Sequence, residues 1–585
     1  MKRLALLAIL ITFHFSLLTS IAQPSWTKKA TKSVFTLKTF DADGTLLGTA
    51  TGFYVGTNGE ALSCFAPFKG AVRALVVDAA GKEHAVDCML GANETYDVAR
   101  FRVDATKTQP LDVAPGMAPE QTQLWLLPWR ETKNLPQGTV TKTETFQQEY
   151  GYYTVTVGSG SPASTTDIAS TADIAGTPLL DDEGLVVAIM QRPYKDDKAS
   201  YAVSARFADS LRISGLSIND PVLRSTQIKK ALPDDIAQAQ LTLYVASAQM
   251  DSAAYASLID DFIAKFPKTH EGYVARAQLA ADGGNYDLAE RDMAVALRVT
   301  DHPDDVHYSF SRMIYRSLPP TPSRSGDSAA EASPSGGGLV GAWTLDRALS
   351  EAQSADAANP QPVYRQQQAV VMAAQKRYAE AYAIYEGLFS SSLRSPELFY
   401  EASQCKAQAG DTLGRIALLD SCLTFFSKPY LKEAAPFLLA NAQARIDAAR
   451  YREGVVMLND YEKLMSAQVN DRFYYLRFQT EVSGRLFQQA LNDIDKAISM
   501  DPQSDLYYAE KASLQVRLGL YDEAAQTARE SICIAPDHSD GYLFLGLAQC
   551  LKGDKEEGVK NLLKAKELGD PQADGLIEKY GMKGE

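Results

Sequence analysis

The N-terminal third of the chain contains few side chains that could carry out acyl transfer. A serine nucleophile needs an imidazole base within hydrogen-bond reach and a carboxylate that orients the base. Asp97 could supply the carboxylate, and Ser159, in a Ser-Gly-Ser-Pro sequence, is a possible nucleophile. The only histidine between residues 23 and 230 is His84, which lies in a strand-like stretch. The sequence of this region therefore predicts that it has no general base for a serine nucleophile.

The sequence from Ser33 to about Ile213 predicts a series of short β-strands, which must position these residues. Stretches rich in β-branched and aromatic residues alternate with turn sequences such as Asp43-Gly44 and Asn58-Gly59. This pattern predicts an antiparallel barrel or sandwich.

Three sequence blocks narrow the prediction, at residues 52–63, 96–101 and 176–189. Their order and separation resemble the trypsin-like serine proteases, and the HtrA-type bacterial members in particular. In that family the first block leads to the catalytic His, the second carries the Asp, and the third follows the Ser and forms a hairpin. The resemblance implies an all-β double barrel over residues 23–215.

The same resemblance places Ala66 at the position of the catalytic His and Ala175 at that of the Ser, while Asp97 matches the family's Asp. Alanine can neither transfer a proton nor attack a carbonyl. An alignment on Ser159 lacks the apolar hairpin that follows Ala175 at Pro178-Leu179-Leu180. The sequence therefore predicts a pseudoprotease without catalytic residues, in which Asp97 caps a turn between strands.

From about residue 234 to residue 585 the sequence changes to helix-forming residues with apolar positions three and four apart. A pattern of small, aromatic and proline residues recurs, with unit starts near 362, 396, 435, 471, 505 and 539. The starts differ by 34, 39, 36, 34 and 34 residues, a spacing typical of tetratricopeptide repeats (TPRs). The sequence predicts an all-α TPR solenoid, a linker at 216–233 and a flexible proline- and glycine-rich insertion at about 317–341.

The first helices of stacked repeats form a concave groove, which commonly binds extended peptides or other proteins. The residues expected to face it are Arg472, Tyr475, Gln479, Ser513 and Arg517. Their aromatic, amide, hydroxyl and basic groups suit a peptide backbone and carboxylates. The expected partner is therefore a protein or peptide.

The N-terminus predicts export. A basic start and an apolar run to Leu18 precede the small residues Ser20-Ile21-Ala22, which predict cleavage before Gln23. The run is shorter than the ~20 apolar residues that a bilayer span needs, and no later segment is apolar enough to span. The sequence predicts a signal peptide at residues 1–22 and a bacterial protein that is periplasmic or secreted, with no transmembrane segment after cleavage.

Charge and cysteine content limit the partners and cofactors. The chain has 58 Lys and Arg against 72 Asp and Glu, a net charge of -14, and no run of basic residues, so nucleic acid is not an expected partner. Among the 6 Cys, a Cys64–Cys88 disulfide is an open possibility in an exported chain. There is no Cys-x-x-Cys sequence, and the closest His pair, His302 and His307, has no Cys nearby, so no metal or cofactor is predicted.

These features together predict a non-enzymatic interaction or scaffolding protein. Two alternatives are open. The first is an active trypsin-like endopeptidase whose repeats recruit substrates. The second is a pseudoprotease that regulates a true protease by holding its substrates.

Overall fold

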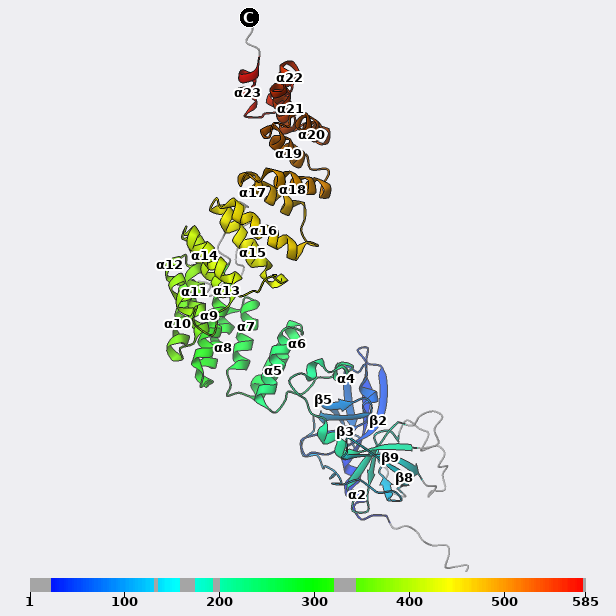
Figure 1. Ribbon diagram of the computed structural model, residues 1–585. Helices are drawn as coiled ribbons and strands as arrows, with labels where there is room; N and C mark the ends of the chain where they lie inside the picture. The colour runs from blue at the N-terminus through cyan, green and yellow to red at the C-terminus, as the bar shows by residue number, and fades with distance from the viewer. Residues whose placement is uncertain (1–22, 131–134, 158–173, 193–199, 320–342, 582–585) are drawn as a thin grey trace, which may run out of the picture. The chain divides into compact units, whose positions relative to one another are not determined.

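A computed structural model describes residues 23–130, 135–157, 174–192, 200–319 and 343–581 (Figure 1). The chain divides into two compact units, Met1–Ala280 and Ala281–Glu585. The first contains all the described β-strands and the first helices, and the second is helical. The predicted signal peptide, the Ser-Gly-Ser-Pro sequence and most of the predicted insertion lie outside the described residues.

The first barrel is closed, with antiparallel neighbours in the order β1-β2-β3-β6-β5-β4. Its strands are β1 (Val34–Phe40), β2 (Leu46–Tyr54), β3 (Glu60–Ser63), β4 (Arg73–Val77), β5 (Glu83–Asn93) and β6 (Val98–Val103). Along β1, Phe35 and Leu37 are fully buried, and they pack with Phe101 of β6 in the barrel core. Such alternation is expected of a strand with one face on a core.

The second barrel is also closed, in the order β10-β11-β12-β9-β8-β7. Its strands are β7 (Gln123–Leu126), β8 (Gln137–Phe146), β9 (Tyr150–Val157), β10 (Pro178–Leu180), β11 (Val186–Met190) and β12 (Ser200–Ser204). One core cluster takes residues from both barrels, including Phe53 and Leu62 from the first and Val186 and Ile189 from the second. The predicted double barrel is confirmed, and this shared core joins its halves.

Residues 216–233, predicted as a linker, pack against the first barrel. The Met89 N–H in β5 donates to the Lys229 carbonyl at 2.7 Å. Leu223 and Ile228 belong to the core cluster of the first barrel and are only 2% and 4% exposed. This segment, which includes the short helix α4 (Pro221–Arg224), therefore packs on the first barrel and contributes to its core.

From residue 235 onward the described elements are helices, apart from a single 3-10 turn at Lys432–Ala434. They are α5 (Ile236–Ser247), α6 (Ser252–Lys265), α7 (Glu271–Asp282), α8 (Tyr286–Val299), α9 (Pro303–Ser317), α10 (Leu345–Ala358), α11 (Pro362–Ala374), α12 (Tyr378–Leu388), α13 (Pro396–Gln408), α14 (Thr412–Leu423), α15 (Ala435–Asp447), α16 (Tyr451–Met465), α17 (Asp471–Ser483), α18 (Phe487–Met500), α19 (Asp505–Arg517), α20 (Tyr521–Ile534), α21 (Ser539–Lys552), α22 (Lys555–Glu567) and α23 (Ala573–Tyr580). The predicted unit starts coincide with the starts of α11, α13, α15, α17, α19 and α21. The predicted TPR solenoid is confirmed.

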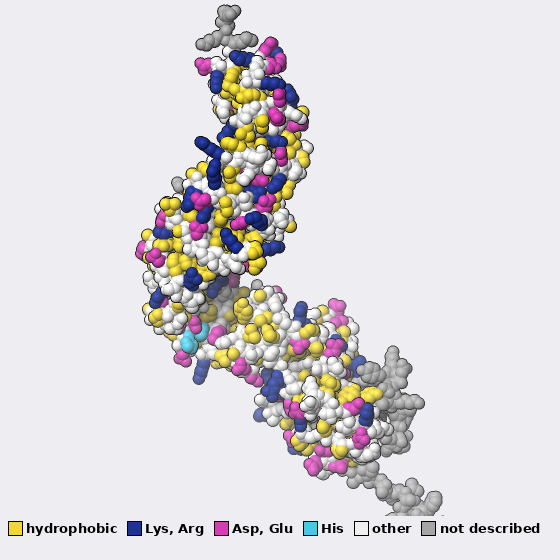
Figure 2. All heavy atoms as spheres, in the orientation of Figure 1, with side chains coloured by type: hydrophobic (Ala, Val, Ile, Leu, Met, Phe, Trp, Pro, Cys, Tyr) yellow, Lys and Arg dark blue, Asp and Glu magenta, His cyan; other side chains and the backbone are white. Residues whose placement is uncertain are grey.

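The surface mixes charges of both signs. Lys and Arg side chains are interspersed with Asp and Glu over the visible face (Figure 2).

Among the described helices, none combines the length and the apolar character that crossing a bilayer requires.

A residue with left-handed backbone closes the first helix of several repeats. Gly410 and Gly519 hold this position after α13 and α19, with φ of 76° and 80°. At the same position after α11, α15 and α17 stand Lys376, Ala449 and Arg485, with φ of 64°, 56° and 58°. A non-glycine residue in this region costs roughly 1–2 kcal/mol. These three turns therefore carry backbone strain that the glycine turns avoid.

Replacing Ala449 by glycine should stabilise the repeat array. Relief of the strain, roughly 1–2 kcal/mol, exceeds the roughly 0.5–1 kcal/mol that glycine costs through chain entropy. The reverse change, Gly519→Ala, should destabilise by about 1 kcal/mol, because a Cβ there meets open space and only the backbone conformation resists it. Thermal unfolding followed at 222 nm should place the two variants on opposite sides of the parent. Shifts of the same sign would contradict this account.

Candidate functional site

Ala66 and Asp97 lie together at the end of β3. Ala66 begins a 3-10 turn, Ala66–Phe68, and its N–H donates to Asp97 Oδ1 at 2.7 Å. The Phe65 N–H donates to the Asp97 carbonyl at 3.3 Å. Asp97 itself has a φ of 48°, a conformation that Asp tolerates better than most residues. In this structure its carboxylate therefore caps the turn that begins at Ala66.

Burial is the main influence on the Asp97 carboxyl. It raises the pKa of Asp97 above its ordinary value, although the hydrogen bond from the Ala66 N–H and the positive charge of Arg192 act in the opposite direction. The raised pKa means that burial disfavours the charged form of this carboxyl group. Arg192 is exposed, and sequence analysis did not single it out.

Ala175 is fully buried in the same core cluster as Cys64 and Phe65, the residues directly before Ala66. Its carbonyl accepts from the Thr51 N–H of β2 at 2.9 Å. Because Phe65 and Ala66 also contact Asp97, the fold gathers all three positions of the predicted degenerate triad at one end of the first barrel.

The next residue, Gly176, approaches the first barrel more closely than a side chain would allow. Its φ is 82°, and a Cβ there would lie 1.9 Å from the Thr51 carbonyl oxygen and 2.9 Å from Ser63 Oγ. Ser63 Oγ itself donates to the Thr51 carbonyl at 2.7 Å. Glycine is therefore required at position 176, and the turn that carries Ala175 is seated on β2 and β3.

His84, Ser159 and Thr177 also carry imidazole or hydroxyl groups in this part of the sequence. His84 Nε2 in β5 is 3.2 Å from Asp78 Oδ2, with which it pairs. Ser159 lies outside the described residues. Thr177 Oγ1 is buried without a hydrogen-bond partner among the described residues. The side chains at the three matched positions are thus two methyl groups and one carboxyl.

A polar link that sequence analysis missed joins the two barrels beside Asp97. Gln191 Nε2 donates to the Tyr96 carbonyl at 2.7 Å, and the Tyr152 hydroxyl donates to Gln191 Oε1 at 2.7 Å. The Tyr96 ring stacks on Phe146 with centroids 4.0 Å apart. These contacts hold the loop that carries Asp97 against the second barrel.

The predicted groove residues lie on two successive first helices, α17 and α19. The Tyr475 hydroxyl donates to Glu510 Oε1 of α19 at 3.2 Å, and its ring lies 5.1 Å from that of Tyr507. Gln479 and Arg472 are exposed on α17. Tyr475 thus connects the two helices.

On α19, Ser513 is half-buried and Arg517 is exposed. The Arg517 guanidinium lies 5.8 Å from the Phe487 ring centroid. Ala512, directly before Ser513, is fully buried, as expected for a small residue that packs inside the repeat. The polar predicted groove residues on α19 are therefore accessible, while the neighbouring Ala512 belongs to the core.

No disulfide joins the cysteines, which all carry free thiols in the described chain. Burial raises the pKa of Cys88 to about 12 and that of Cys64 well above its ordinary value. Cys64 lies in the core of the first barrel, while Cys88 Sγ lies 3.3 Å from Asp87 Oδ2. The structure therefore does not contain the Cys64–Cys88 bond that the sequence left open.

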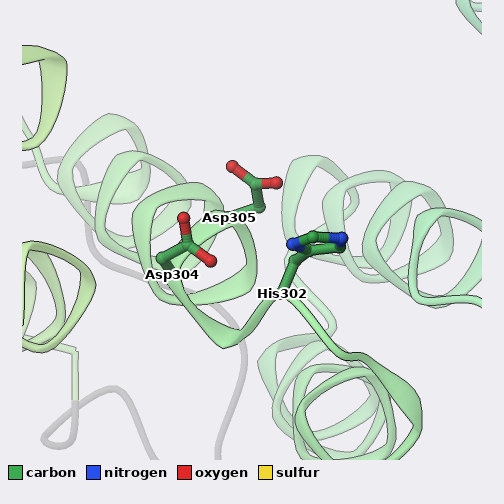
Figure 3. A group of neighbouring side chains, drawn as sticks. All are labelled: His302, Asp304 and Asp305. Carbon is green, nitrogen blue, oxygen red and sulfur yellow. The ribbon is translucent and has the colours of Figure 1, made fainter. Parts of the chain in front are cut away.

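His302, Asp304 and Asp305 gather at the start of α9, with one ligand atom of each within 4.8 Å of the others (Figure 3). Asp304 Oδ2 accepts from Asn359 and from the Tyr364 hydroxyl, each at 2.9 Å. Acidic residues in a first helical turn are favoured by the helix dipole. The Tyr364 hydroxyl also lies 2.9 Å from Asp305 Oδ1. These contacts give the two acids a structural role.

Comparisons with known proteins agree with both parts of the fold. A family model described as a trypsin-like peptidase domain matches residues 50–189. Over 95 residues the chain is 30% identical to small glutamine-rich tetratricopeptide repeat-containing protein 2 of Saccharomyces cerevisiae, a match that covers 16% of this chain and 28% of that protein. The chain thus spans less than a third of that curated relative.

Two solved structures resemble parts of the chain. The Rv3671c protease from M. tuberculosis, in its active form, is 15% identical with a TM-score of 0.27, and the match covers 36% of this chain and 90% of that one. YrrB, described as a TPR protein with an unusual peptide-binding site, is 15% identical with a TM-score of 0.28, and the match covers 33% of this chain and 97% of that one. The family match and the observed architecture together define a fusion of a trypsin-like domain with a TPR array.

Substitutions at Asp97 should separate its charge from its hydrogen bond. Because the pKa of folded Asp97 is raised, the stability that this group contributes is present at acid pH and is lost as pH rises through the folded pKa. Asp97→Asn removes that loss and can still accept from the Ala66 N–H, so it should be at least as stable as the parent at pH 7. Asp97→Ala leaves the donor without its partner and should cost about 1–3 kcal/mol.

Denaturant unfolding at pH 3, below the ordinary pKa of an Asp side chain, and at pH 7 measures both effects. The stability gained by Asp97→Asn over the parent should be larger at pH 7 than at pH 3. An asparagine variant less stable than the alanine variant would refute the capping role.

Proposed function

We propose that this chain is an exported, non-enzymatic interaction or scaffolding protein, in which a pseudoprotease domain is joined to repeats that bind a protein or peptide. The observation that carries the proposal is the pair of alanines, Ala66 and Ala175, at the positions that the family resemblance gives to the base and the nucleophile. Neither methyl group can take part in acyl transfer. The third position, Asp97, is occupied as a cap for a turn.

Several features of the repeats support a role in peptide binding. Gln404, Gln443 and Gln479 occupy the same position on the successive first helices α13, α15 and α17, and all are at least partly exposed. A side-chain amide offers both a donor and an acceptor, which matches a peptide backbone. Tyr400 and Leu439, one turn earlier on α13 and α15, are 37% and 39% exposed. The exposed face of these first helices therefore combines amide groups with accessible apolar surface.

Export rests on the N-terminal sequence alone. A basic start, an apolar run and the small residues before Gln23 fit a signal peptide. In this proposal the mature protein begins at Gln23 and works in the periplasm or outside the cell.

The purified chain should not hydrolyse casein or small ester substrates above background, because the family resemblance leaves alanine at the positions of the base and of the nucleophile. Ser159→Ala should leave that background unchanged. Reproducible hydrolysis that disappears in Ser159→Ala would establish the endopeptidase alternative instead. If the chain protects substrates from an added trypsin-like protease, the regulatory alternative gains support.

The groove prediction is tested by capture of partners from an envelope extract on the full chain. Tyr475→Ala combined with Arg517→Ala should weaken capture at least tenfold, because truncating an aromatic or Arg anchor commonly costs about 2 kcal/mol or more. The matched control is Gln526→Ala with Arg529→Ala, two exposed residues of the second helix α20, which should capture as the parent does. If the groove variant captures partners as well as the parent does, the groove assignment is wrong. The barrels then become the next candidate for the binding surface.

A further inference from the structure

A small pocket opens between the C-terminal halves of α11 and α13, several repeats away from Tyr475. Its volume is about 270 Å³, smaller than the roughly 300–1,000 Å³ of typical small-molecule sites. One wall is apolar, made of Val370, Ala373 and Ala374 of α11. Its size suits one long side chain better than a whole ligand.

Three tyrosines line the rest of the pocket. Tyr315 comes from α9, while Tyr378 and Tyr385 come from α12. Tyr315 and Tyr378 are half-buried, whereas Tyr385 is only 2% exposed. Aromatic rings around a cavity attract cations through the negative charge of their faces.

Glu401 of α13 adds a carboxylate to the same pocket. Its described partners are neutral: Gln366 Nε2 donates to Oε2 at 2.9 Å, and the Tyr385 side chain is hydrogen-bonded to it. Within the described chain no Lys, Arg or His forms an ion pair with this carboxylate. Lys406, the basic residue nearest in the sequence, pairs with Asp411 at 3.0 Å instead.

The negative charge of Glu401 raises the pKa of neighbouring groups. Burial and then the charge of Glu401 raise the pKa of Tyr385 well above its ordinary value. The same two causes raise the pKa of Cys405 to about 11. No positive group contributes to either shift. The pocket therefore presents a negative potential inside aromatic and apolar walls.

We propose that this pocket binds the basic side chain of an extended peptide, with its aliphatic stem against Val370, Ala373 and Ala374 and its cationic head between the tyrosines and Glu401. A long basic side chain has an apolar stem and a charged tip, which matches the two kinds of wall. A cation would give Glu401 the charge-assisted partner that it lacks. An anionic ligand would meet this carboxylate, and a purely apolar one would leave it desolvated.

A second pocket of about 540 Å³ shares Tyr315 and Ala374 with the first, and Arg316, Trp343 and Leu345 also line it. This inference rests on the proposed peptide-binding role of the repeats, and it names the kind of side chain that they select.

The test uses the full chain and three short peptides with blocked ends, acetyl-Ala-Ala-X-Ala-Ala-amide, where X is lysine, arginine or norleucine. Norleucine keeps the stem and lacks the charge. Affinities are measured by ligand-observed NMR titration. A basic peptide should bind at least tenfold more tightly than the norleucine peptide, and the lysine and arginine arms decide which head group fits.

Variants locate the effect. Glu401→Gln keeps an acceptor for Gln366 and Tyr385 and should reduce the preference for the basic peptide to less than twofold. Glu397→Gln, an exposed carboxylate of the same helix α13, is the matched control and should preserve it. Tyr315→Leu keeps an apolar wall and should weaken only the basic peptides, by roughly two- to fivefold. Far-ultraviolet circular dichroism should show parental helix content for each variant.

The outcomes separate this inference from the proposed function. If the norleucine and basic peptides bind equally, the pocket does not select a cation, although peptide binding by the repeats stands. If neither peptide binds, or if Glu397→Gln abolishes the preference as fully as Glu401→Gln does, the proposed pocket is wrong. Partner capture through Tyr475 and Arg517 concerns other repeats and can succeed in either case.

Discussion

The backbone of Gly176 lies so close to the Thr51 carbonyl that no side chain fits at this position. This contact seats the turn before β10, in the second barrel, on β2 of the first barrel, and the Thr51 N–H bond to the Ala175 carbonyl fixes it further. On the other side, the Asp97 carboxylate holds the start of the turn at Ala66. The site is therefore assembled by backbone groups, one glycine and one carboxylate. None of these contacts involves the side chain at position 66 or 175, so the fold tolerates alanine at both, and architecture and chemistry are separable.

The repeats depend on a different constraint, because one helix pair cannot bury its apolar face alone. Buried polar groups add to the apolar packing between successive pairs. Arg477 of α17 donates through Nε to Asp493 of α18 at 2.5 Å and through Nη1 to Glu462 of α16 at 2.7 Å. Burial, with the nearby charge of Asp493, raises the pKa of Glu481 to about 8. Breaking such a buried pair is costly because it leaves an uncompensated charge, so this network favours a single alignment of these helices.

The sequence was informative where the signal is local or periodic. The double barrel and the repeat starts at α11 to α21 were predicted correctly, because each depends on residues close together or on a fixed spacing. Contacts between distant residues left no such signal. Gln191 meets Tyr96 across 95 residues, and Glu401 meets Gln366 across 35. The segment at 216–233 was interpreted as a linker because its composition does not reveal that Leu223 and Ile228 complete the core of the first barrel.

We propose that this trypsin-like domain belongs to a binding protein that has no activated serine. Labelling with a fluorophosphonate probe tests that claim most directly, because the probe reacts only with a serine whose proton can be removed by a neighbouring base. The purified chain should show no labelled band under conditions that label an active trypsin-like protease completely. A labelled band that disappears when the chain is denatured beforehand would contradict the account.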